Sequence, residues 1–144
     1  MRSFLQKLLF VCLVAVSTGG AFSGTGAGEM LDLPHGALQR LVELRATPKF
    51  EAEEAFGYVG FLPLDGRPAA EAELDLLIDR IIAGIEANPT KGFVLSEFRR
   101  TFVHFVESDT EDRERLMRYF EQIMNLVGMD TSDGALNRML YEFG

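Results

Sequence analysis

The segment DTSDGALNRMLYEFG, residues 130–144, holds the pattern in this chain that comes nearest to a metal site. Two aspartates enclose a Thr-Ser pair and a glycine follows, as in loops that bind calcium through oxygen ligands. A calcium loop of the helix-loop-helix type needs oxygen ligands at positions 1, 3 and 5, glycine at 6 and glutamate at 12. Counted from Asp130, position 5 is Gly134 and position 12 is Tyr141. The spacing therefore argues against a calcium site.

Helix capping is a simpler interpretation of the same residues. Asp130 or Ser132 can accept hydrogen bonds from the free amides of a last helix over about 131–141, and Asp133 can complement its dipole. Gly134 in the first turn of that helix costs up to about 1 kcal/mol relative to alanine. That cost suggests close packing of another backbone or of a partner. We expect any special surface of the protein at Asp130, Ser132, Asp133, Gly134, Asn137 and Arg138.

The histidines do not complete a catalytic or metal site. His104 can share a helix face with Glu107, but one imidazole and one carboxylate fall short of the three or four ligands that zinc requires. Ser96 precedes His104 by two helical turns, about 12 Å, so the two cannot form a nucleophile–base pair. We therefore predict neither a metal nor a cofactor, and the sequence identifies no catalytic residue.

The first 23 residues have the layout of a secretory signal peptide. Arg2 and Lys7 precede an apolar run over residues 8–16, and residues 21–23 place small side chains around a cleavage site. The run is shorter than the roughly 20 residues that a membrane-spanning helix needs, and a buried N-terminal helix is the alternative. We predict a signal peptide over 1–23, a flexible leader over 24–30 and a single helical domain over 31–144. The protein would then be exported to the periplasm or the cell exterior, without a stable membrane anchor.

Cleavage would make the protein more acidic. It removes Cys12, the only cysteine, together with two basic residues, so Lys+Arg falls from 14 to 12 while Asp+Glu stays at 22 and the net charge moves from −8 to −10. Such a charge disfavours nucleic acids and anionic membrane surfaces as partners. It favours a partner protein with a basic surface, although solubility alone also explains it.

Apolar side chains recur at helical spacing along most of the chain, and no segment alternates strictly. Asp32 and Thr90 are suited to cap helices, Ser108 and Glu111 have capping-box spacing, and Gly128 can end a helix. The predicted fold class is all-α, a compact bundle of four to five helices with one aromatic-rich ordered loop. We expect helices over about 34–45, 68–87, 90–107, 108–127 and 131–141.

The aromatic-rich segment is KFEAEEAFGYVGFLPLDGRP, residues 49–68. Its glycines and prolines interrupt regular structure, so we expect a short helix over about 50–56 and then a loop lying on the core. A short strand around Tyr58 is the alternative.

The helix predicted over 108–127 carries charges at helical spacing. Glu111 lies four residues before Arg115, and Glu114 lies four residues before Arg118. Both pairs have the order that favours ion pairs on a solvated helix face.

The C-terminal third also carries a family resemblance. Matching stretches include Thr110-Glu111, Arg113-Glu114-Arg115, Tyr119-Phe120-Glu121, Ile123-Met124 and Ser132-Asp133-Gly134 with Leu136-Asn137. In these the chain resembles an uncharacterised bacterial family, domain of unknown function 4844, over about residue 38 to the end, and NPTKGFVLSEF and ATPKF are also similar. Thr131 and Glu142 depart from the family pattern. The resemblance implies a small, mostly helical domain and no assigned activity.

Three functions remain open from the sequence. Size, acidity and the signal peptide favour an exported, non-enzymatic module that binds another protein, such as an inhibitor or immunity protein. A small hydrolase would use His104, Glu107, Asp130 or Asp133. A small-molecule binder would use the segment 50–61 as a lid.

Overall fold

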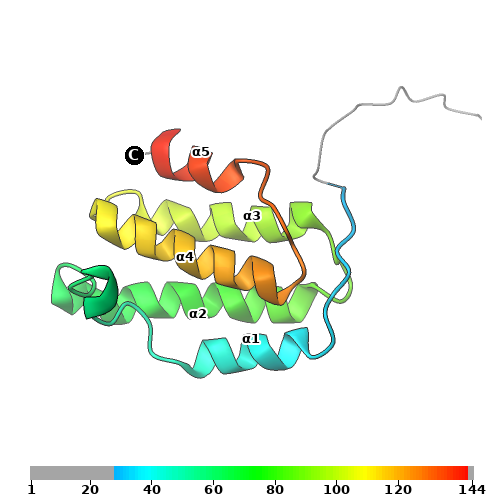
Figure 1. Ribbon diagram of the computed structural model, residues 1–144, viewed down its shortest axis with the longest axis horizontal. Coiled ribbons are helices and arrows are strands. Elements are labelled where there is room, and N and C mark those ends of the chain that lie inside the picture. The colour runs from blue at the N-terminus through cyan, green and yellow to red at the C-terminus, as the bar shows by residue number, and fades with distance from the viewer. Residues whose placement is uncertain (1–27, 143–144) are drawn as a thin grey trace, which may run out of the picture.

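A computed structural model describes residues 28–142 and shows a bundle of five α-helices (Figure 1). Among these residues there is no β-strand, only two isolated bridges that join Met30 to Thr90 and Glu53 to Tyr58. The all-α prediction is confirmed, whereas the predicted signal peptide lies outside the described residues. The α-helices are α1 (Ala37–Ala46), α2 (Arg67–Gly84), α3 (Lys91–Phe102), α4 (Thr110–Leu126) and α5 (Ala135–Glu142), and the short 3₁₀-helices are η1 (Glu54–Phe56), η2 (Leu64–Gly66) and η3 (Val103–Phe105).

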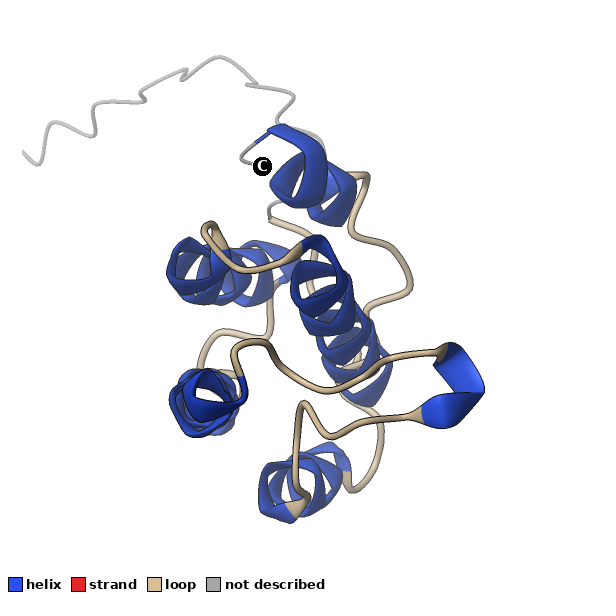
Figure 2. Cartoon of the chain, turned by 90° about the vertical axis from the view of Figure 1, so that its left-hand side faces the viewer, coloured by secondary structure: helices blue, strands red, loops and turns tan. Residues whose placement is uncertain are grey.

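The first four α-helices run side by side, and α5 closes the bundle against α3 and α4 (Figures 1 and 2). Between the helices the interior is apolar, and the rings of Phe98 and Phe120 stack with centroids 4.2 Å apart. The apolar spacing read from the sequence explains this packing, because side chains three and four residues apart share one helix face. Fully buried positions include Leu74, Leu77, Ile78, Ile81, Val94, Phe98, Leu116, Phe120 and Ile123.

Helix α1 begins later than predicted. Its N-cap is Gly36 in the left-handed conformation, with φ +77°, and Asp32 does not cap it. Asp32 lies four residues before this N-cap, in a segment whose Leu31 amide donates to the Pro89 carbonyl at 2.7 Å. Thr47 ends the helix, as the following proline predicts.

One of the two predicted caps in the middle of the chain is confirmed. The Thr90 hydroxyl accepts from the Phe93 amide at 3.2 Å at the start of α3. The prediction of a capping box at Ser108 is wrong, because the N-cap of α4 is Asp109 and no side chain caps the helix. Ser108 belongs to the preceding turn, in which its amide donates to the Phe105 carbonyl at 3.0 Å.

The end of α4 and the start of α5 depend on glycines. Gly128 follows α4 with φ +72°, as predicted for a helix terminator. The prediction that Gly134 lies inside the first turn of the last helix is wrong, because α5 begins at Ala135. Gly134 has φ +77° and Asp133 has φ +50°, so glycine is a favourable choice here rather than a costly one.

Within residues 28–142, none of the helices combines the length and the hydropathy that crossing a membrane requires.

Candidate functional site

The segment 49–66, called the aromatic loop below, is anchored in the core by Phe50. This residue is fully buried and has φ +56°. Its ring lies 5.5 Å from that of Phe61, 5.7 Å from that of Phe105 and 5.2 Å from that of Tyr119. The Tyr119 hydroxyl accepts from the Phe50 amide at 2.9 Å, so the unusual backbone conformation is stabilised by a side chain of α4. Of the short helix expected over 50–56, only the 3₁₀-helix η1 forms. Of the alternative strand around Tyr58, only an isolated bridge between Glu53 and Tyr58 forms.

A buried carboxylate makes a second anchor for the aromatic loop. Asp112, on the first turn of α4, is 1% exposed. Its Oδ1 accepts from the Tyr58 hydroxyl at 2.6 Å and its Oδ2 accepts from the Leu62 amide at 3.1 Å. Burial and the hydrogen bond to Asp112 both raise the pKa of Tyr58, so the phenol keeps its proton at a pH at which an ordinary tyrosine ionises. One carboxylate thus fixes two points of the loop.

The beginning of the aromatic loop is fixed to α2 by a buried ammonium group. The side chain of Lys49 is fully buried, and its Nζ donates to the carbonyls of Arg45 and Thr47 at 2.8 and 2.7 Å. The same Nζ lies 2.7 Å from Asp75 Oδ1, and the Lys49 amide donates to Glu71 Oε1 at 3.2 Å. A buried charge with these partners is satisfied, and it ties the loop to a helix.

The outer side of the aromatic loop presents apolar groups to solvent, although the loop is held firmly below. We call the four side chains that form it the apolar edge. Phe56 is 62% exposed, Val59 66%, Leu62 42% and Leu64 69%. The Arg118 guanidinium lies over the Phe56 ring, 4.8 Å from its centroid. Four large exposed apolar side chains within nine residues of one ordered segment make this loop a candidate contact surface.

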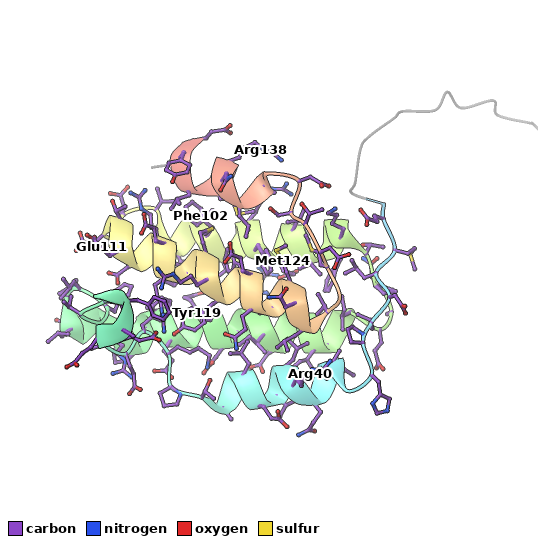
Figure 3. The ribbon with its side chains drawn as sticks, in the orientation of Figure 1. Arg40, Phe102, Glu111, Tyr119, Met124 and Arg138 are labelled. Atoms are coloured by element: carbon purple, nitrogen blue, oxygen red, sulfur yellow. The ribbon has the colours of Figure 1, made fainter. Side chains whose placement is uncertain are left out.

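The ion pairs expected along α4 differ from those in the structure. Arg115 pairs with Glu53 Oε2 at 2.6 Å rather than with Glu111. Its guanidinium also lies 5.4 Å from the ring centroid of Tyr58 and 5.2 Å from that of Tyr119. The reason is tertiary: the aromatic loop covers this face of α4 and offers a carboxylate and two aromatic rings at once. Figure 3 shows Tyr119 on the side of α4 that faces the loop, and Glu111 at the helix start.

The predicted surface near the C-terminus divides into two groups. Four of its six residues come together around a polar hollow of about 470 Å³ between α4 and the turn before α5. Glu121 and Asn125 of α4 also line it, and no sequence pattern indicates them. The four predicted residues in the hollow are Asp130, Ser132, Gly134 and Asn137.

The other two predicted residues have structural partners. Asp133 Oδ2 lies 2.7 Å from the Nζ of Lys91, whose side chain is only 3% exposed, and Glu29 Oε2 lies 3.0 Å from the same nitrogen. Arg138 Nη1 donates to the Asp133 carbonyl at 3.2 Å (Figure 3 labels Arg138). We expected Asp133 to complement the dipole of the last helix, whereas in the structure its carboxylate pairs with Lys91 at the start of α3. The hydrogen bond from Lys91 lowers the pKa of Asp133 below its usual value.

This pairing predicts a pH dependence of stability. Because the pKa of Asp133 is lower in the folded than in the unfolded chain, its contribution is complete above the unfolded value, about 3.8, and is lost as the pH falls through the folded value. Asp133→Asn should therefore lower the urea midpoint at pH 7, and the gap to wild type should close as the pH falls below about 3.8. The matched control is Asp130→Asn, since Asp130 makes no ion pair within residues 28–142. A gap that stays constant down to about pH 2.5 would contradict the pairing.

The histidine expected to share a face with a carboxylate has a different partner. His104 Nε2 lies 3.7 Å from Glu73 Oε2 of α2, and the imidazole is 53% exposed. The structure does not pair it with Glu107, because α3 ends at Phe102 and the chain then continues in η3. His104 and Glu73 lie at the border of a second hollow, beside Phe61 and Phe105 of the core cluster.

Comparison with known proteins agrees with the fold. The crystal structure of a DUF3571 family protein from Acinetobacter baumannii superposes with a TM-score of 0.65 and 26% sequence identity, over 74% of this chain and 89% of the other. No curated protein sequence matches the chain. The family described as "Domain of unknown function (DUF4844)" matches residues 32–144, which include all five α-helices and both groups of predicted surface residues. By that match the chain belongs to the DUF4844 family.

Proposed function

We propose that this protein is an exported, non-enzymatic module that binds another protein, with an inhibitor or immunity protein as its concrete form. The observation that carries the proposal is the apolar edge: four exposed apolar side chains on a loop that the core holds in place. Apolar groups at a protein surface lose little by staying exposed singly, but a cluster gains free energy when a partner removes it from water.

Preorganisation supports the same function. The aromatic loop is joined to the bundle through Lys49, Phe50 and Asp112, so its outer side chains are presented in a fixed arrangement. A surface whose backbone is already ordered loses less conformational entropy on binding, and this raises affinity for a given contact area.

The hollow at the C-terminal end is proposed as a second contact region for the partner. Its hydroxyl, amide and carboxylate groups include Ser132, Asn137 and Asp130, and they suit the polar rim of an interface. A paired substitution, Asp130→Asn with Asn137→Ala, should weaken partner binding only a few-fold, because rim contacts carry little of the binding energy.

The test of the main proposal uses the chain as bait in an extract of its source cells, with bound proteins quantified by mass spectrometry. We expect the bait to recover one partner in stoichiometric amount. The paired substitution Val59→Ser with Leu64→Ser should abolish the binding of that partner. The matched control is Val42→Ser with Leu76→Ser, which removes the same side chains from positions 47% and 50% exposed on α1 and α2. Equal loss of the partner in both paired variants, or no partner at all, would count against the apolar edge.

Export is tested separately. Residues 1–30 are fused to a phosphatase that folds into its active form only outside the cytoplasm. The predicted signal peptide should give activity, and replacing two leucines of its apolar run by arginine should abolish it. Activity that survives this change, or never arises, would remove export from the proposal while leaving the protein-binding role intact.

A further inference from the structure

A hollow of about 420 Å³ lies beside the apolar edge, between the aromatic loop and the start of α4. Its walls combine apolar and acidic side chains, and no basic residue is among them. Two residues of the apolar edge, Val59 and Leu62, belong to this lining, so the hollow is continuous with that part of the edge. The lining consists of Gly57, Val59, Gly60, Leu62, Asp109, Glu111 and Asp112.

The acidic groups of this hollow have no cationic partner within residues 28–142. Asp109 and Glu111 are exposed and take part in no ion pair there. The carboxylate of Asp112 is buried, and both of its hydrogen bonds come from neutral donors, the Tyr58 hydroxyl and the Leu62 amide. Figure 3 shows Glu111 at the end of α4 that lies next to the aromatic loop.

The start of α4 does not cancel this charge. A helix N-terminus contributes the equivalent of about half a positive charge, against three carboxylates in the hollow. The lining of the hollow therefore carries carboxylates and no cation, next to apolar groups. Lysine and arginine fit that combination, because each has an apolar stem and a cationic head. The stem can lie along Val59 and Leu62 while the head reaches the carboxylates of Asp109 and Glu111.

We propose that the apolar edge binds a protein segment in which a lysine or arginine stands beside apolar residues, and that the hollow takes the basic side chain. This inference rests on the proposed protein-binding function and adds the chemistry of the partner. Charge complementarity gives the contact its specificity and its dependence on salt, while burial of the apolar edge gives it most of its affinity.

The experiment selects binding sequences from a phage-displayed library of random twelve-residue peptides, using the purified chain as the target. We expect the enriched peptides to carry Lys or Arg next to apolar residues. One enriched peptide is then synthesised in two forms, one with its basic residues and one with glutamine in their place. The dissociation constant of each form is measured at low and at high salt. The glutamine form should bind at least about tenfold more weakly.

Paired variants locate the charge effect. Asp109→Asn with Glu111→Gln should weaken the basic peptide about tenfold and leave the glutamine peptide unchanged. The matched control, Asp32→Asn with Glu86→Gln, removes the same charges from two exposed positions that line neither hollow, and it should change neither peptide. Val59→Ser with Leu64→Ser should weaken both peptides.

The outcomes separate the two proposals. The enriched peptides could be apolar without basic residues and still depend on Val59 and Leu64. That result would support the apolar edge as a protein-binding surface and contradict the inference that the hollow binds a basic side chain. If Asp32→Asn with Glu86→Gln weakens the basic peptide as much as Asp109→Asn with Glu111→Gln does, the peptide responds to net charge and the inference about this hollow is overturned. If no peptide responds to the substitutions in the apolar edge, the proposed function fails together with the inference.

Discussion

Asp112→Ala should lower the free energy of unfolding by about 3 kcal/mol, because it leaves one buried and one partly buried donor without an acceptor at once. The Tyr58 hydroxyl and the Leu62 amide both donate to this carboxylate, at 2.6 and 3.1 Å. An unpaired buried donor costs about 1–3 kcal/mol, and removal of the buried charge returns part of that cost. The chain has no tryptophan, so urea unfolding is followed by far-UV circular dichroism and tyrosine fluorescence.

Tyr58→Phe is the matched control for this prediction. It removes one donor together with its need for an acceptor, so we expect a smaller loss, about 1–2 kcal/mol. In the double variant the phenyl ring at position 58 has no hydroxyl that needs the missing carboxylate, and the combined loss should fall short of the sum by about 1 kcal/mol or more. Strictly additive losses would show that the hydroxyl and the carboxylate do not interact.

Gly128→Ala should be about as damaging, with a loss of about 3 kcal/mol, because the new methyl group has no room and the backbone is strained. A Cβ at this position would lie 2.5 Å from the Asp32 carbonyl oxygen and 3.1 Å from Pro34 Cδ. The φ of +72° adds a conformational cost for any side chain. Thermal unfolding by circular dichroism measures the change.

Gly134→Ala separates strain from close approach. Gly134 has almost the same φ, +77°, but a Cβ there meets only Arg138 Nη1, at 3.2 Å. That atom is the end of a flexible side chain and can move away, so we expect a loss of only about 1 kcal/mol. Similar losses at Gly128 and Gly134 would mean that the contact with Asp32 is unimportant and that φ alone decides both.

The sequence predicted the helices well where one local pattern decides the structure. The stripe that includes Leu74, Ile78 and Ile81 is buried as expected, since helical spacing alone places these side chains on one face. Thr90 caps α3 because an N-cap needs only its own hydroxyl and a nearby amide. Val42 shows the limit of that pattern: it follows the fully buried Leu41 on α1 but is 47% exposed, because α1 lies at the side of the bundle.

The candidate site could be predicted only in part. Four of six surface residues lie around one hollow, because they follow each other closely along a single turn. The buried charges of Lys49, Lys91 and Asp112 could not be found, since a charged residue in a sequence usually indicates solvent exposure. Their partners come from distant segments, and no local pattern records such contacts. The apolar edge was hidden for a related reason: the same aromatic-rich composition supplies both its exposed side chains and the buried ring of Phe50.

The ammonium group of Lys91 gives this chain something that many small extracellular proteins obtain from a covalent bond. Glu29 lies among the first described residues and Asp133 near the last, and both carboxylates contact one nitrogen at the start of α3. Residues 28–142 contain no cysteine, so among them this contact takes the place of a disulfide that would join the two ends. The difference lies in what opens it: a reductant has no effect on an ion pair, whereas acid and high salt weaken it.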